Sequence, residues 1–342
     1  MMADEETDQW YVDGNHKFGA VGISGQAGLR FEDASKLSLK GRFALNVPRG
    51  GYDPHAHVKD MDFDHIVGGV LFPTQGLSVW LVPDGELLSA IFRGYNDWIT
   101  DFCKPYPDRL KGIGMINVDD IDDGVGELQR CAEMGMAGAM IATGPFIRYD
   151  DPRYEPLWAT AQDLDMPLNL HAGCMRASEW MSDALVETIN NDPVIFSTQL
   201  THPVMTSISA MIFSGVFERY QSLRVGAVEF EASWAPYLLG RMDDTYKNRV
   251  AGYTGHRFQG SSLPSDFFRS NCFVGFQEDD LGVQLRHTIG VDNLLWGSDY
   301  PHGESTFPKS LEIVERILNG VPEAEKAKIA GENCARLYHF NM

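Results

Sequence analysis

The sequence predicts an α/β fold, a distorted (β/α)8 TIM-type barrel whose first strand is absent or atypical. Short apolar runs alternate with helical segments throughout the chain, but only seven runs occur where a closed barrel needs eight. The runs, typical of buried parallel strands, are Ile66–Phe72, Leu110–Val118, Met136–Ala142, Pro167–His171, Leu223–Glu229, Cys272–Glu278 and Asn293–Asp299. Since neither an internal repeat nor a low-complexity linker interrupts them, we expect residues 1–342 to form one domain.

The N-terminal segment, residues 1–58, is atypical of a barrel. Trp10–Phe18 has the pattern of a β-hairpin and a loop with Gly and Pro follows, but residues 9–58 contain no apolar run of strand type. The missing unit is therefore the first one. Its absence would leave unpaired edges on the runs at 66–72 and 293–299, which the N-terminal segment or oligomerisation could cover.

Two helices can be placed from their apolar stripes. The first spans Glu86–Phe102, must end before Pro105, and has an apolar stripe of Leu87, Ile91, Trp98 and Phe102. In the second, Ser233 can cap a helix with a proline in its first turn, and the expected buried face is Trp234, Leu238 and Met242.

Two longer segments, 174–206 and 243–270, stand out between the regular units. Both are rich in aromatic, Met and polar residues. Inserts after barrel strands usually build the pocket, so we expect both segments to form part of it.

Composition and charge exclude several classes of function. The formal net charge of -20 argues against nucleic-acid binding, which requires a basic surface. No stretch approaches the about 18 apolar residues of a membrane helix, and the acidic N-terminus is unlike a secretory signal. The five cysteines are far apart, which favours reduced, buried thiols over disulfides or a thiolate zinc site. We expect a cytoplasmic protein that binds neither membrane nor nucleic acid.

The strongest signal is a carboxylate at the mouth of the last strand, Asp299 in Gly-Ser-Asp-Tyr-Pro-His at 297–302. Barrels keep metals and catalytic acids at this end of their strands. In Pro167–His171, alternation turns Leu168 and Leu170 towards the helices and leaves His171 at the inner rim. His171 could instead be a core residue, and Asp299 could simply form a turn. Because both residues end the inner face of a strand, a metal or acid/base site is favoured.

Four further residues could act at the same mouth. Glu229 ends another strand and could ligate a metal, act as a general base or simply begin a loop. His202 and His302 lie in loops that could reach the site, or could be solvated. Arg176 follows His171 closely and could pair with a substrate carboxylate, which suits a guanidinium.

The pair His55 and His57 has the His-x-His spacing of a zinc site. On a strand, both imidazoles would point the same way. Here a turn sequence precedes the pair and a short helix follows it. We therefore interpret His55 and His57 as non-ligands.

Four segments carry a resemblance to a known family: His171–Gly173, Glu229 five residues before Trp234, the 297–302 string, and the closing 333–338 segment. Together they resemble the amidohydrolase superfamily, in particular amidohydrolase family 2, which contains amino-carboxymuconate-semialdehyde and resorcylate-type decarboxylases. The resemblance runs over nearly the whole chain from about Trp10. It implies a metal-dependent hydrolase-like barrel with one divalent ion, and hydrolysis or non-oxidative decarboxylation of a small carboxylated, often aromatic, compound.

The resemblance also implies roles for individual residues. His171 matches the metal-binding His of the fifth strand, and Asp299 matches the eighth-strand Asp that ligates the metal or lies against its water. Where the decarboxylases have a catalytic His on the sixth strand, this chain has Glu229. The opening strand with Asp-x-His, His-x-His or Glu-x-His, which supplies two metal ligands in the family, has no match here.

The sequence thus predicts a metal-dependent hydrolase or non-oxidative decarboxylase that binds a small-molecule substrate and forms a homo-oligomer. The predicted ion is zinc, with manganese or iron as alternatives. The expected metal ligands are His171 and Asp299. The expected catalytic residues are Asp299, Glu229 and His202. The expected substrate-binding residues are His302 and Arg176. The alternative is a catalytically degenerate barrel that binds a small acid or a protein partner without turnover.

Overall fold

The computed structural model describes residues 2–3, 7–12, 16–22, 25–38, 40–176, 198–248 and 256–341. Its main element is a curled, all-parallel sheet in the order β10-β9-β8-β7-β6-β5-β4. The strands are β4 (Gly69–Leu71), β5 (Leu110–Met115), β6 (Gly138–Ile141), β7 (Leu168–His171), β8 (Val225–Val228), β9 (Cys272–Phe276) and β10 (Leu294–Trp296). Each lies inside one of the seven predicted runs, so the α/β barrel prediction is confirmed.

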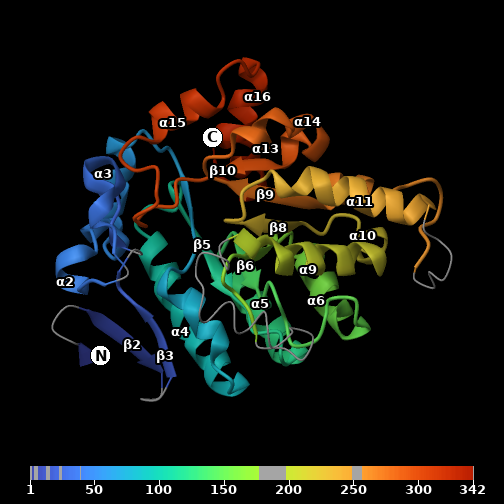
Figure 1. Cartoon of the computed structure of the whole chain (residues 1–342). Coiled ribbons are helices and arrows are strands. Elements are labelled where there is room, and N and C mark those ends of the chain that lie inside the picture. Colours follow the sequence, from blue (N-terminus) through green and yellow to red (C-terminus); the bar gives the residue numbers. More distant parts are fainter. Residues whose placement is uncertain are drawn as a thin grey trace.

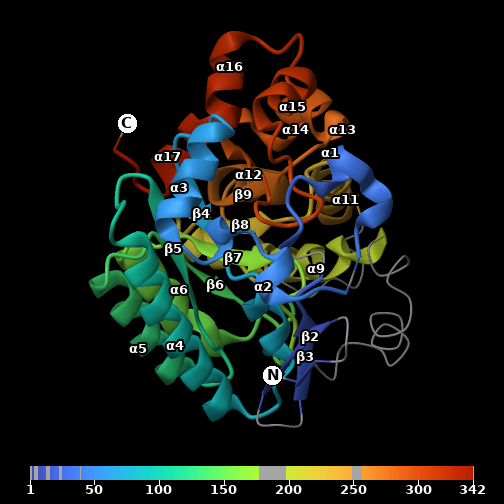
Figure 2. The same cartoon turned by 90° about the vertical axis from the view of Figure 1, so that its left-hand side faces the viewer.

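Helices cover the outer face of this sheet, as the two views show (Figures 1 and 2). The α-helices are α1 (Leu29–Asp33), α2 (Phe43–Asn46), α3 (Pro54–Phe63), α4 (Gly85–Cys103), α5 (Ile121–Glu133), α6 (Glu155–Asp163), α9 (Thr201–Phe213), α10 (Val216–Arg219), α11 (Trp234–Asn248), α12 (Pro264–Asn271), α13 (Asp280–Gln284), α14 (Arg286–Ile289), α15 (Ser310–Ile317), α16 (Glu323–Ala327) and α17 (Asn333–Leu337). Short 3-10 turns are η2 (Ala34–Lys36), η3 (Arg49–Gly51), η4 (Gln75–Leu81), η5 (Pro152–Tyr154) and η6 (Val291–Asn293), and η7 (Lys328–Glu332) is a π-helical turn.

The alternation of side chains separates an outer and an inner apolar layer. Leu168 and Leu170 of β7 pack in the outer cluster with the helices, as predicted. Asn169 points inward and is fully buried, where its Oδ1 accepts a hydrogen bond of 2.6 Å from the hydroxyl of Tyr338. The inner cluster contains Phe273 and Leu295 as well. The inward direction of His171 follows from the same alternation.

The N-terminal segment does not complete the barrel. The predicted hairpin is confirmed as β2 (Asp8–Val12) and β3 (His16–Ala20), which pair antiparallel and form a small sheet with β1 (Met2–Ala3). In this sheet, β3 packs against η4 (Gln75–Leu81), and Figure 1 shows the sheet apart from the strands of the barrel. Among the described residues no strand of the parallel sheet precedes β4, so β4 and β10 are both edges.

Side-chain contacts cross from one edge of the sheet to the other. The hydroxyl of Tyr300 donates to Asp60 of α3, and a 3.2 Å hydrogen bond joins His302 Nε2 to Thr74 Oγ1 after β4. Asp64, at the end of α3, accepts a 2.9 Å hydrogen bond from the backbone N–H of Ser310. These contacts hold the ring together where a strand is missing.

The predicted helices exist, with one correction to their faces. The buried apolar side chains of α4 include Leu88, Phe92, Ile99 and Phe102, whereas Trp98 is 46% exposed. Except at Phe102, each buried residue therefore lies one position after the residue predicted for the apolar stripe. On α11 the predicted face of Trp234, Leu238 and Met242 is buried.

Two composition-based expectations can be compared with the structure. All five cysteines are free and four of them are buried, as predicted. No helix among the described residues has the length and apolar character needed to cross a membrane. Most of the insert 174–206 and part of 243–270 lie outside the described residues, so their pocket-forming role and the single-domain assignment stay predictions.

Candidate metal and active site

A cavity of about 1270 Å³ opens at the carboxyl ends of the strands. Four predicted site residues line it: His171, Glu229, Asp299 and His302. The cavity continues along β4 and β10, and aromatic residues such as Phe72 and Phe276 form part of its wall. The carboxyl ends of parallel strands are where barrels hold their active sites.

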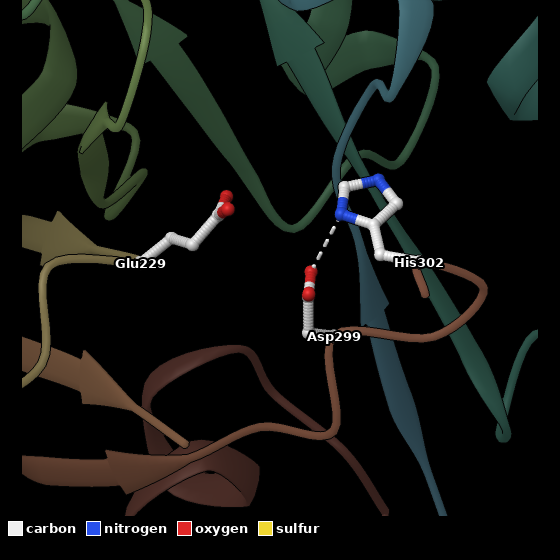
Figure 3. Close-up of side chains that lie close together, drawn as sticks. All are labelled: Glu229, Asp299 and His302. Atoms are coloured by element: carbon white, nitrogen blue, oxygen red, sulfur yellow. Dashed lines mark ion pairs between the residues drawn. The ribbon is translucent and has the colours of Figure 1, made fainter. Parts of the chain in front are cut away.

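Three of these side chains point towards one another from two strand ends (Figure 3). Ligand atoms of Glu229, Asp299 and His302 all lie within 4.8 Å of one another. His302 Nδ1 forms a 2.9 Å ion pair with Asp299 Oδ1. His171 Nε2 lies 3.1 Å from Glu229 Oε2, so the imidazole of β7 adjoins the group. His171 and Asp299 both lie close to Glu229, so the structure places this predicted pair at one site.

For Glu229 the backbone conformation, and not strand alternation, directs the carboxylate into the cavity. Alternation would turn Glu229 to the same side as Ala227, which belongs to the outer cluster. Instead Glu229 has φ 64° and Asp299 has φ 61°, both in the left-handed region that non-glycine residues rarely adopt. Such conformations cluster at functional sites. Their occurrence at two strand ends that face one cavity supports a site here.

Glu231 shows the other possible use of a carboxylate at a strand end. It also has a positive φ, of 55°. Its side chain accepts hydrogen bonds from the backbone N–H groups of Gln277 and Glu278, at 3.1 and 3.4 Å. Glu231 thus fixes the end of β9, which leaves Glu229 as the carboxylate of β8 that faces the cluster.

The close approach of these groups shifts their pKa values. Enclosure of Glu229 by the cavity wall and the charge of Asp299 raise the pKa of Glu229 to about 8. Its side chain is 39% exposed, but that exposure is towards the cavity it lines. Burial alone would lower the pKa of His302, but its hydrogen bond to Asp299 and the nearby carboxylates raise it to about 9. Burial lowers the pKa of His171 to about 4, so this imidazole is neutral.

This donor set fits a divalent cation. Carboxylate oxygens and imidazole nitrogens are the ligands of zinc in catalytic sites and also suit manganese. A cation among Glu229, Asp299 and His302 would stabilise the two carboxylates and displace the protons held there. His171, neutral and adjacent to Glu229, can serve as a further nitrogen ligand.

Arg176 does not reach the cluster, which corrects its predicted substrate-binding role. It is buried, at 1% exposure. Its guanidinium donates to the backbone carbonyls of Trp80 and Val82, both at 2.5 Å, and to Asp119 at 2.7 Å. Because these partners occupy the guanidinium, Arg176 holds η4 and the end of β5 against the loop after β7.

His202 is also placed away from the predicted site. It lies in α9 and not in a loop, and it is exposed. It lines a separate hollow together with Arg148 and His256. The catalytic role predicted for His202 therefore has no support from the structure.

His55 and His57 lie on a helix, α3, and not on a strand. His55 Nδ1 is 2.9 Å from the hydroxyl of Tyr106, and His57 Nδ1 is 2.9 Å from the carbonyl oxygen of Gly50. Both rings have partners away from the three-residue cluster. This agrees with their interpretation as non-ligands.

No sequence pattern indicates the residues that support the site from α3 and from the loop after β4. Asp60, Asp64 and Thr74 contact the loop that follows β10 from positions more than 200 residues earlier. No local pattern marks such partners, because the contact exists only once β4 and β10 face each other.

Comparison with known proteins gives a consistent family. A family model described as amidohydrolase matches residues 53–340. A curated relative, gamma-resorcylate decarboxylase of Rhodococcus jostii (strain RHA1), is 25% identical over 309 residues, which cover 83% of this chain and 87% of the relative.

Two solved structures show the same fold. An amidohydrolase from Mycobacterium avium subsp. paratuberculosis K-10 superposes with a TM-score of 0.75 at 22% identity, over 97% of this chain and 91% of its own. A dihydroxybenzoic acid decarboxylase from Polaromonas sp. JS666, with bound manganese and the inhibitor 2-nitroresorcinol, has a TM-score of 0.68 at 20% identity. The match covers 84% of this chain and 86% of the decarboxylase chain.

Proposed function

Because this chain belongs to the amidohydrolase family, whose model matches residues 53–340, we propose that it is a metal-dependent, non-oxidative decarboxylase of small aromatic carboxylic acids. The observation that carries the proposal is the cluster of Glu229, Asp299 and His302 beside His171, in a cavity at the carboxyl ends of the strands. The decarboxylase named among its relatives favours carbon–carbon cleavage over hydrolysis.

We propose that Glu229, Asp299 and His302 hold one divalent ion, with His171 as a further ligand. The ion would supply a positive charge that fixes the substrate carboxylate. Zinc is the ion that the sequence predicts, and the manganese in the Polaromonas relative supports manganese as the alternative. Both accept this mixture of oxygen and nitrogen ligands.

The residues around the cluster suit an aromatic acid. Phe72 and Phe276 line the cavity and can bury the flat ring, while the charged end of the substrate lies towards the cluster. In decarboxylation the bond to the carboxylate breaks, its electron pair stays on the ring carbon, and a proton must be delivered there. Because Glu229, Asp299 and His302 would be deprotonated when the ion is bound, that proton must come from a group other than these three ligands.

A second candidate function is binding without turnover. It is favoured by the absence, among the described residues, of a strand between β10 and β4 that could add ligands. The three clustered residues would then bind a cation only weakly. A homo-oligomeric state and a cytoplasmic location stay predictions.

The proposal is tested by incubating the purified full chain with manganese or zinc and a panel of hydroxylated benzoates, and measuring carbon dioxide release. We expect release that depends on added metal and is lost in Glu229→Gln. The matched control, His202→Ala, should retain full activity because it is remote from the cluster. Metal-loaded protein that releases no carbon dioxide from any member of the panel would contradict a decarboxylase and favour the second candidate.

A further inference from the structure

We propose that Gln277 and Asp279, in the segment after β9, are positioning residues that hold the cluster of Glu229, Asp299 and His302 in place. The clustered side chains come from the loops after β8 and β10, and β9 lies between these two strands in the sheet. Figure 3 shows Glu229 entering the cluster from one loop and the other two residues from the second. The segment after β9 therefore has a ligand-bearing loop on either side. This inference rests on the proposed function, because it concerns the same site.

Asp279 holds the loop that carries Glu229. It is buried, at 8% exposure. Its Oδ2 accepts hydrogen bonds from the backbone N–H groups of Ala232 and Ser233, at 2.8 and 2.6 Å. Its Oδ1 accepts a 2.8 Å hydrogen bond from the backbone N–H of Gly282 and so caps α13. Because hydrogen bonds to a charged acceptor are the strong ones, α13 and the loop after β8 are held together as one unit.

Glu231 joins the same two loops in the opposite direction. Its carboxylate belongs to the loop after β8 and accepts the backbone N–H groups of Gln277 and Glu278. Its own backbone carbonyl accepts a 2.9 Å hydrogen bond from the indole of Trp234. The crossed carboxylates of Glu231 and Asp279 thus fix the backbone directly after Glu229. A left-handed backbone such as that of Glu229, with φ 64°, persists only where the surrounding structure holds it.

Gln277 holds the loop on the other side, which carries Asp299 and His302. Its side-chain amide donates to the backbone carbonyls of Ser298 and Glu304, at 3.3 and 2.9 Å. These two carbonyls lie before and after the two clustered residues in the chain. One amide group therefore fixes both ends of the segment that supplies Asp299 and His302.

Close packing behind the segment keeps it in place. A Cβ on Gly282 would lie 2.8 Å from the Cβ of Ala232 and 2.9 Å from Oδ2 of Asp279, so α13 approaches the loop after β8 as closely as glycine allows. Glu278 forms ion pairs with Arg30 of α1 and, at 2.7 Å, with Arg316 of α15. The segment is thus anchored to other elements before any cation binds.

These contacts predict an effect on metal affinity. Metal ligands must be held close to their productive positions by the hydrogen bonds around them. Loss of such supporting partners typically lowers metal affinity about 10–100-fold. Gln277 and Asp279 act through the ligands and not on the ion, so their loss should weaken binding without removing a ligand.

The test measures the manganese affinity of the purified full chain by calorimetric titration, and the melting temperature of the metal-free protein. In Gln277→Ala and in Asp279→Ala the affinity should fall about 10–100-fold. The matched control is Asp120→Ala, because Asp120 accepts the N–H groups of Asp122 and Asp123 at the start of α5, at 3.0 and 3.1 Å, and supports no clustered residue. It should lower the melting temperature as Asp279→Ala does and leave the affinity unchanged.

Two conservative variants separate hydrogen bonding from loss of packing. Asp279→Asn keeps one oxygen that can accept the N–H groups of Ala232 and Ser233, and should recover most of the affinity lost in Asp279→Ala. Gln277→Met keeps the length of the side chain and removes the donor, so it should bind manganese as weakly as Gln277→Ala. Because Gln277 is only half-buried, this pair remains informative if Asp279→Ala does not fold.

Crystals of the metal-free variants separate this inference from the proposed function. Asp279→Ala should lose the 3.1 Å contact between Glu229 and His171, and Gln277→Met should show Asp299 displaced from Glu229. If the wild type binds no manganese, the cation site of the proposed function is contradicted, and these crystals alone decide the inference.

The inference would be overturned by a manganese affinity in Gln277→Met equal to that of the wild type, or by an equal fall in affinity in Asp120→Ala. Metal-free crystals of the variants in which Glu229, Asp299 and His302 all keep their positions would also overturn it.

Discussion

The two sides of the barrel differ in how they are held together. On the closed side, every residue of β6 and β7 is buried, and each strand pairs on both edges. On the open side, no residue of β4 is buried, and β4 and β10 each pair on one edge only. In the cluster, Glu229 lies on the closed side, as does the adjoining His171, whereas Asp299 and His302 lie on the open side. A cation bound there would connect the two sides.

The largest expected effect is on the open side. Asp299→Asn removes the carboxylate that contacts His302 and belongs to the proposed metal site. We expect the variant to lose bound metal, and its turnover to fall at least about 100-fold. The fold should remain, because Asp299 is only partly buried and follows the end of β10. Metal analysis, activity assay and circular dichroism measure the three effects. Unfolding of the variant would instead indicate a structural role.

On the closed side, the largest effect should be on stability. Arg176→Ala would leave Asp119 and two backbone carbonyls without their buried partner, so we expect a loss of about 3–5 kcal/mol in the free energy of unfolding. Urea denaturation measures this. A variant of normal stability with a raised KM would restore the substrate-binding role predicted from the sequence.

The contacts that replace the missing strand can be tested on α3. Asp64→Ala removes the buried acceptor of the Ser310 hydrogen bonds, and should cost about 1–3 kcal/mol because the donors remain buried. The matched change Asp62→Ala removes an exposed ion pair with Arg109 and should cost at most about 1 kcal/mol. Equal losses in the two variants would show that Asp64 does not link the open edges.

The smallest expected effect is a dependence of metal affinity on pH. Without metal, Glu229 and His302 hold protons at pH 7, since their pKa values are about 8 and about 9. Because a cation must displace these protons, affinity should rise between pH 7 and 9. His171, with a pKa of about 4, contributes no change in this range.

Calorimetric titration of metal at several pH values measures this dependence. In Glu229→Gln one of the two protons is absent, so its affinity should rise less steeply with pH. The same titration with Asp62→Ala, far from these protons, should follow the wild-type slope. Affinity that falls as the pH rises would contradict the assignment of these residues as ligands.

The comparison of the two sides also explains which sequence predictions succeeded. Within strands, the apolar pattern reflects burial directly, so the seven strands and the inward direction of Asn169 and His171 were predicted correctly. Beyond the strand ends the pattern fails. Glu229 reaches the cluster only because its backbone is left-handed, which no periodicity reveals.

The two misplaced residues failed for different physical reasons. The role of Arg176 depends on Asp119 and on carbonyls more than 50 residues away, which a sequence pattern cannot place. His202 carried a signal that was missed, since Pro203 lies in the first turn of α9, where proline is compatible with a helix. His302 was expected to bind substrate, and the structure places it beside Asp299.

The central claim is that the two sides of the barrel share one cation, and anomalous diffraction from crystals soaked in manganese chloride tests it most directly. We predict a single strong peak in contact with Glu229, Asp299 and His302. Crystals that diffract well and show no peak at these residues, or a peak bound elsewhere, would contradict the claim.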